Sequence, residues 1–165
     1  MRFPFFHRVH SLKFSKRMAD SPRIRTAEIL LIEDNPGDVG LIREAFRGVA
    51  APHRLNVVEN GRSALQYLRR EQQYEEAPRP DLLLLDLSLP DVDGLKVLAE
   101  IKNDPALRRI PAVVFSGSRE PAEVLEAYNL NANSYIAKPA ELAGFIRVAK
   151  GVEDFWLTVV KLPKD

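Results

Sequence analysis

The chain has 165 residues, with 24 lysines and arginines against 23 acids, and no cysteine. This length fits one domain with a tail, and the lack of cysteine excludes a disulfide scaffold, a thiolate zinc site and a cysteine nucleophile. No apolar run approaches the ~18 residues of a membrane-spanning helix. We therefore expect no membrane segment, and the absence of cysteine fits a reducing compartment such as the cytoplasm.

Charge is unevenly placed along the sequence. Residues 1–25 hold seven basic residues and one acid, a net charge of +6, so residues 26–165 carry −5 of the total of +1. We expect residues 1–26 to be a disordered basic leader, with Met18 as an alternative start of the protein. Contact with nucleic acid or an anionic membrane is the competing interpretation of such a tail.

Apolar runs and amphipathic segments alternate through the body of the chain. The apolar runs predict strands over 28–33, 55–58, 81–86, 111–115 and 134–137. Helical periodicity predicts helices over 37–49, 62–70, 95–103, 120–130 and 141–155. In the last helix, the side chains expected to face inward are Leu142, Phe145, Ile146, Ala149, Val152 and Phe155.

Five strand–helix units predict an α/β fold with a parallel sheet covered by helices on both faces. The favoured arrangement is the flavodoxin-like (βα)5 doubly wound sheet with strand order 2-1-3-4-5. We expect this single domain to span residues 27–155, with a C-terminal arm over 156–165. In such sheets the site lies beyond the carboxyl ends of the strands, between the first and third.

Chemically active side chains follow four of the predicted strands. Glu33 and Asp34 follow the first, Asp86 the third, Ser116 the fourth and Lys138 the fifth. Carboxylates gathered at one edge repel each other, and a divalent cation removes that repulsion. All-oxygen ligands favour Mg²⁺.

A carboxylate beside a metal ion and an ammonium group can accept a phosphoryl group. The cation and Lys138 would neutralise charge on the transferring oxygens, and Ser116 could donate a hydrogen bond to one of them. Each residue alone has an ordinary explanation as a turn, a helix cap or a surface group. Their joint occurrence at successive strand ends favours phosphoryl transfer to Asp86.

Four blocks of sequence resemble the receiver domain of bacterial two-component response regulators. They are I-L-L-I-E-D-N-P, D-L-L-L-L-D-L-S-L-P-D-V-D-G, P-A-V-V-F-S-G-S and S-Y-I-A-K-P. The run E-D-N-P-G-D and the ending E-D-F-W-L-T-V-V-K-L-P further resemble the small stand-alone regulators paired with phytochrome-type light-sensing kinases.

The resemblance implies a role for each matching residue. Asp86 matches the phosphoacceptor, and Lys138 matches the family's lysine, followed by a cis peptide bond to Pro139. Ser116 and Tyr135 match the switch residues, and Gly94 matches the turn glycine after the acceptor loop. The implied Mg²⁺ ligands are Glu33, Asp34, Asp86 and the backbone carbonyl of Ser88.

The resemblance implies a single-domain response regulator that takes a phosphoryl group from a histidine kinase and signals through protein contacts. It would catalyse only its own Mg²⁺-dependent phosphorylation and dephosphorylation. The alternative is a degenerate receiver that binds proteins independently of phosphorylation. Ten residues follow the last predicted helix, too few for a DNA-binding module, so we expect no direct DNA binding.

The apolar, β-branched stretch after residue 155 permits two interpretations. It could pack back on its own domain. Alternatively, it could form a strand or arm that buries Trp156 and Leu157 against a second copy. The resemblance to phytochrome-type regulators implies a homodimer of the second kind.

Overall fold

The computed structural model describes residues 25–163 and holds a five-stranded parallel sheet. The predicted leader lies, except for its last two residues, outside the described residues. The strands are β1 (Ala27–Ile32), β2 (His53–Val58), β3 (Leu82–Leu85), β4 (Ala112–Ser116) and β5 (Ser134–Ala137). Their order, β2-β1-β3-β4-β5, confirms the predicted fold.

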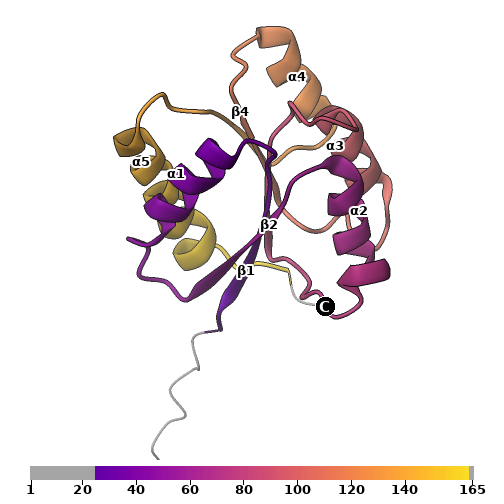
Figure 1. Ribbon diagram of the computed structural model, residues 1–165, viewed down its shortest axis with the longest axis horizontal. Coiled ribbons are helices and arrows are strands. Elements are labelled where there is room, and N and C mark those ends of the chain that lie inside the picture. The colour runs from indigo at the N-terminus through magenta and orange to yellow at the C-terminus, as the bar shows by residue number, and fades with distance from the viewer. Residues whose placement is uncertain (1–24, 164–165) are drawn as a thin grey trace, which may run out of the picture.

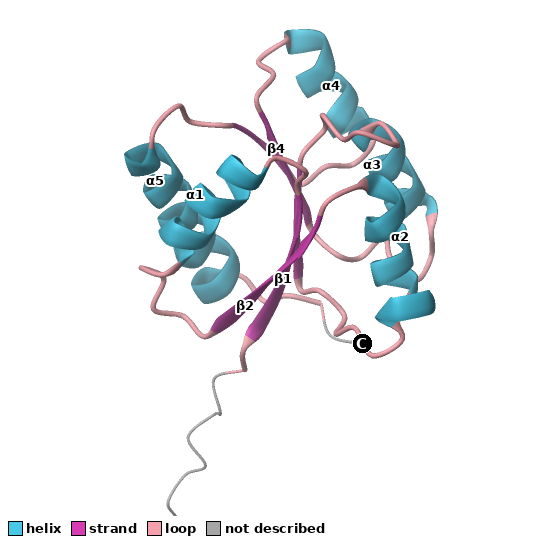
Figure 2. Ribbon diagram, viewed as in Figure 1, coloured by secondary structure: helices cyan, strands magenta, loops and turns pink. Residues whose placement is uncertain are grey.

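Helices cover both faces of the sheet, as Figures 1 and 2 show. They are α1 (Pro36–Phe46), α2 (Gly61–Arg69), η1 (Gln72–Tyr74), α3 (Gly94–Asn103), α4 (Pro121–Asn129), α5 (Leu142–Val152) and η2 (Glu153–Val159). One apolar core lies between the sheet and α1 and α5, and the other lies under α2, α3 and α4. The central strands β1, β3 and β4 are apolar on both sides because each side faces a core.

The register of the sheet aligns the ends of the strands that carry the candidate site. Ile32 pairs with Leu85, so Glu33 and Asp86 leave the sheet side by side. On the other side of β3, Leu85 pairs with Val114. Ser116 pairs with Ala137, and the N–H of Lys138 donates to the Ser116 carbonyl at 2.8 Å. One edge of the sheet therefore collects all four strand ends.

The loop between β3 and α3 is held by side-chain caps and by a glycine. Asp93 accepts from the N–H of Leu95 at 2.8 Å and caps α3, while Asp91 accepts from Gly61 and Arg62 at the start of α2. A Cβ at Gly94 would lie 2.4 Å from the Leu87 backbone. Only glycine fits this close approach, which places the loop against the end of β3.

The C-terminal segment packs back on its own domain, as the first of the two interpretations has it, but it is helical and not a strand. The residues after 155 do not form a strand. Instead, α5 continues directly into the π-helical turn η2. Trp156 and Leu157 are half-buried against the core under α1 and α5. Their own domain thus covers the residues that the dimer interpretation assigned to a second copy. Phe155, predicted to face inward, is 52 % exposed because the turn rotates it outward.

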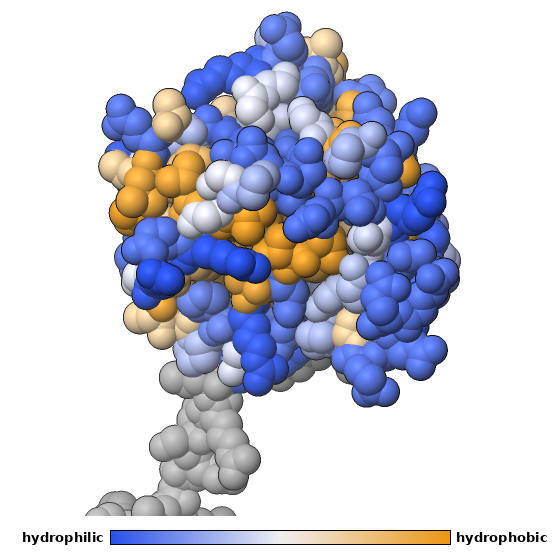
Figure 3. Space-filling view, viewed as in Figure 1, coloured by the Kyte–Doolittle hydropathy of each residue, from blue (hydrophilic) through white to orange (hydrophobic). Residues whose placement is uncertain are grey.

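Helix α5 buries a narrower stripe than its periodicity predicted. Phe145, Ala149 and Val152 face the sheet, whereas Leu142 and Ile146 are 38 % and 48 % exposed because they lie on the flank of the helix. Figure 3 shows an apolar band surrounded by hydrophilic side chains on the face seen there. None of the described helices is long and apolar enough to cross a bilayer.

Candidate functional site

Three carboxyl groups meet at the carboxyl edge of the sheet. Glu33 and Asp34 follow β1, Asp86 follows β3, and one oxygen from each lies within 4.8 Å of the other two. Glu33 and Asp86 are buried, whereas Asp34 is exposed. Solvent therefore reaches only Asp34 of the three acids at these strand ends.

The ammonium group of Lys138 lies among these acids. Its Nζ is 2.6 Å from Glu33 Oε2, 3.0 Å from Asp86 Oδ2 and 2.9 Å from Asp38 Oδ2. The contact between Lys138 Nζ and Glu33 Oε2 is an ion pair whose angles are not those of a hydrogen bond. Among the described residues, no donor makes a hydrogen bond to this oxygen. The other oxygen of Glu33 accepts from the Asn35 N–H at 3.0 Å.

The electrostatics of the cluster shift the pKa of its members in opposite directions. Burial raises the pKa of Glu33 to about 7, against the opposing contacts with Lys138 and the Asn35 N–H. Burial would lower the pKa of Lys138, but its contacts with Glu33, Asp38 and Asp86 outweigh burial and raise it. The lysine is thus firmly charged, and its one ammonium contacts three carboxyl groups.

This donor set fits a divalent cation. Glu33, Asp34 and Asp86 supply oxygens close enough to share one ion, and the acids outnumber the available ammonium. Hard cations such as Mg²⁺ and Mn²⁺ bind such oxygen ligands. Ser88 is exposed in the loop after β3, and its N–H donates to Asp86 Oδ1 at 3.2 Å. The role of its carbonyl as a ligand stays a prediction.

Both predicted switch residues contact the loop residue Ser118, and the Tyr135 hydroxyl also lies within hydrogen-bonding reach of the Ser116 side chain. Ser116 is fully buried, and its Oγ accepts from the Ser118 N–H at 3.2 Å. The Tyr135 hydroxyl lies 2.9 Å from the Ser118 carbonyl and 2.8 Å from Glu123 Oε1. Burial, followed by the Glu123 contact, raises the pKa of Tyr135. Ser118 thus connects the two residues.

Sequence reasoning missed one acid and was wrong about one peptide bond. Asp38 lies in the first turn of α1 and contacts Lys138, a hundred residues away. Its only sequence signal was its place in E-D-N-P-G-D. The bond before Pro139 is not cis, as no described peptide bond is. The trans form is the intrinsically favoured one before proline, and Lys138 reaches Asp86 from it.

A buried acid beside an ammonium, with two further acids close enough to share a cation, lies at the switch point of a flavodoxin-like sheet, which is where proteins of this fold bind their ligands. Residues 29–150 match the response regulator receiver domain family. The chain is 42 % identical over 135 residues to response regulator Rcp1 of Synechocystis sp., covering 82 % of this chain and 92 % of Rcp1.

Two solved structures are similar throughout the domain. The phosphorylated cyanobacterial phytochrome response regulator RcpA is 46 % identical, with a TM-score of 0.81 over 85 % of this chain and 100 % of RcpA. The Mn²⁺-bound form of Rcp1 is 40 % identical, with a TM-score of 0.79 over 84 % of this chain and 99 % of Rcp1. This chain therefore belongs to the receiver domains of response regulators, whose general role is phosphorylation-dependent switching, and whose members bind divalent metal ions.

Proposed function

We propose that this protein accepts a phosphoryl group from a histidine kinase on Asp86 and signals through protein contacts that depend on that group. The observation that carries the proposal is the position of Asp86: buried, at a strand end, 3.0 Å from Lys138 and within reach of two further acids. The cation proposed for Glu33, Asp34, Asp86 and the Ser88 carbonyl is Mg²⁺. When bound, it supplies positive charge to the phosphoryl oxygens.

The transfer step uses the groups of this chain as follows. An oxygen of the Asp86 carboxylate attacks phosphorus, the phosphorus–nitrogen bond to the kinase histidine breaks, and the imidazole leaves with the electron pair. Lys138 stabilises negative charge on the phosphoryl oxygens. The Ser116 hydroxyl donates to one of these oxygens, and Tyr135, whose hydroxyl bonds to the same loop at Ser118, responds to the change.

The reaction class and the partner follow from this chemistry. The chain catalyses only its own phosphorylation and dephosphorylation, and its donor is a kinase of the cytoplasm. RcpA is named a cyanobacterial phytochrome response regulator, which supports a phytochrome-type kinase as the donor here. The switch responds to phosphate only through the difference in its affinity for the two conformations. Output is through proteins and not through direct contact with DNA.

Incubation with Mg²⁺ and either acetyl phosphate or a phosphorylated histidine kinase tests the proposal. The expected result is an acid-stable, base-labile label on Asp86 that disappears when Mg²⁺ is chelated. A binding module that works without phosphorylation predicts no label on the wild-type chain, and that outcome would refute the proposal.

We also propose a homodimer that uses the C-terminal arm. Phe155 and Val159 are 52 % and 72 % exposed on η2, and large exposed apolar side chains of this kind suit a contact with a second copy. Sedimentation of the full chain should give a dimer, and a chain truncated after Phe155 should give a monomer. An unchanged dimer after truncation would rule out the arm.

A further inference from the structure

The loop between β3 and α3, residues 86–93, contains the Ser88 carbonyl that we assign to the cation. At the start of this loop, the Asp86 N–H donates to the Ile32 carbonyl at 3.0 Å, and Asp86 Oδ2 lies 3.0 Å from Lys138 Nζ. The neighbouring strand and the lysine therefore hold Asp86 in place. Ser88 lies two residues beyond the first of these bonds, so the position of its carbonyl depends on how the loop is held.

Asp91 joins this loop to the N-terminus of α2. Its Oδ1 accepts from the Gly61 N–H at 2.8 Å, and its Oδ2 accepts from the Arg62 N–H at 3.0 Å. Oδ1 also accepts from the N–H of Val92 at 2.7 Å. Desolvation would raise the pKa of Asp91, but the backbone N–H groups around it outweigh desolvation and lower the pKa. The side chain is therefore a carboxylate at neutral pH, and a negative charge is favourable at a helix N-terminus.

The loop and α2 also pack closely at Gly61. A Cβ placed on Gly61 would lie 2.7 Å from Val97 Cγ2 and 3.0 Å from Val92 Cβ. A larger residue at this position would therefore push α2 away from the loop and from α3. The loop is thus fixed on α2 in two ways, by the hydrogen bonds of Asp91 and by the close packing at Gly61.

The segment from Ser88 to Asp91 is short and restrained at both ends. Two residues, Leu89 and Pro90, lie between them, and the proline ring fixes one of the few torsions in the segment. On one side, the Ser88 N–H donates to Asp86 Oδ1 at 3.2 Å. On the other side, Asp91 fixes the chain to α2. A change at Asp91 should therefore reach the Ser88 carbonyl.

We propose that Asp91 is a positioning residue for the cation site, because its bonds to α2 keep the Ser88 carbonyl where that oxygen can bind the cation. The proposal rests on the proposed function, which assigns the Ser88 carbonyl to Mg²⁺. Groups that orient a metal ligand without contacting the metal typically change metal affinity by about 10- to 100-fold when they are removed. The effect of Asp91 is therefore measurable as a change in Mg²⁺ affinity.

Calorimetric titration with Mg²⁺ tests this role. D91A should bind Mg²⁺ about tenfold more weakly than the wild type, because the Ser88 carbonyl is no longer held in place. In labelling by acetyl phosphate, the Mg²⁺ concentration that gives half of the maximal rate should rise by about the same factor. In the metal-free protein, the amide hydrogens of Ser88 and Leu89 should exchange faster in D91A than in the wild type.

Asn60 provides the matched control for the loss of a helix cap. It caps the same helix as Asp91, since its Oδ1 accepts from the Ser63 N–H at 2.8 Å, but it precedes α2 and is not part of the loop. N60A should therefore lower the melting temperature as D91A does. Unlike D91A, it should keep the wild-type Mg²⁺ affinity.

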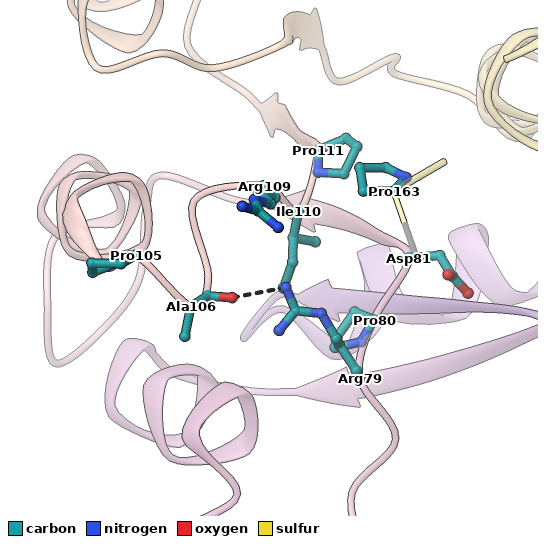
Figure 4. A pocket seen from close by; sticks show the side chains of 9 residues that line it. All are labelled: Arg79, Pro80, Asp81, Pro105, Ala106, Arg109, Ile110, Pro111 and Pro163. Carbon is teal, nitrogen blue, oxygen red and sulfur yellow. Dashed lines mark hydrogen bonds between the residues drawn. The ribbon is translucent and has the colours of Figure 1, made fainter. Parts of the chain in front are cut away.

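A second control removes a loop contact at the opposite edge of the sheet, where the strands begin. There Arg79 donates to the Ala106 carbonyl at 2.7 Å, beside the hollow that Figure 4 shows. This bond holds the loop between α3 and β4, which leads into the amino end of β4. R79A should also keep the wild-type Mg²⁺ affinity.

The proposal would be overturned by a folded D91A with the wild-type Mg²⁺ affinity, or by an equal loss of affinity in N60A or R79A. If D91A does not fold, G61A takes its place, since a Cβ there displaces α2 from the loop and should also weaken Mg²⁺ binding. Wild-type affinity in a folded G61A would likewise overturn the proposal. A wild type that binds Mg²⁺ but takes no label on Asp86 would instead overturn the proposed function, and the Mg²⁺ affinity of D91A would still decide the role of Asp91.

Discussion

The two edges of the sheet both bury acids, but they balance the charge differently. At the amino edge, Glu28 contacts Arg54 at 3.0 Å and Asp81 contacts Arg25 at 3.0 Å, one arginine for each acid. Asp81 also accepts from the Glu28 N–H at 2.8 Å. At the carboxyl edge, a single lysine, Lys138, forms ion pairs with three acids. The paired acids leave little charge for a further cation to neutralise, whereas the excess of acids at the carboxyl edge favours the binding of a cation.

The largest effect should come from replacing the acid that follows β3. The acid that precedes the same strand serves as the control. Asp86→Asn removes the carboxylate nucleophile and should abolish labelling by acetyl phosphate, measured by intact-protein mass spectrometry. Asp81→Asn, which precedes the same strand, should keep the labelling. Labelling of Asp86→Asn at the wild-type level would show that the two edges do not differ in this way.

The next largest effect is expected on the rate of phosphorylation when the ammonium of Lys138 is removed. Lys138→Met should slow phosphorylation by about 10²-fold, because no other cation of the chain contacts Asp86 within the described residues. Lys102 is the matched control, since its Nζ lies 2.9 Å from the Ile110 carbonyl and contacts no acid among the described residues. Lys102→Met should phosphorylate at the wild-type rate in stopped-flow experiments. Similar rates for the two variants would contradict the assigned role of Lys138.

A smaller effect is expected for the exposed acid of the cluster. Asp34→Asn should weaken Mg²⁺ binding about tenfold in calorimetric titrations, since one charged ligand becomes neutral. Because Asp34 is exposed, the stability of the metal-free protein should change little. Glu44→Gln, an exposed acid at the other end of α1, is the control. Equal Mg²⁺ affinities for both variants would place the cation elsewhere.

The smallest effect is expected on the pH dependence of the free energy of unfolding. Burial raises the pKa of Glu33 from 4.5 to about 7, so the folded protein holds this proton more tightly than the unfolded chain. The contribution of Glu33 to the free energy of unfolding is therefore greatest below pH 4.5 and decreases as the pH rises to about 7. Urea unfolding in chelator at several pH values measures it. Glu33→Gln should lack this decrease, whereas Glu28→Gln should keep it.

The fold and most of the acidic cluster follow from sequence because both depend on local patterns. Apolar runs locate β1, β3 and β4, and the acids that end two of them adjoin the predicted switch point. Asp38 was not predictable in this way, because its contact with Lys138 depends on how α1 lies over the sheet edge. The helical turn η2 was missed because β-branched residues favour strands, and packing of Trp156 on the core overrode that preference.

Anomalous diffraction from crystals soaked in Mn²⁺ compares the two edges most directly. We expect an anomalous peak among Glu33, Asp34 and Asp86, and none beside Glu28 and Asp81. A peak at the amino edge, or no peak at the carboxyl edge, would contradict this expectation.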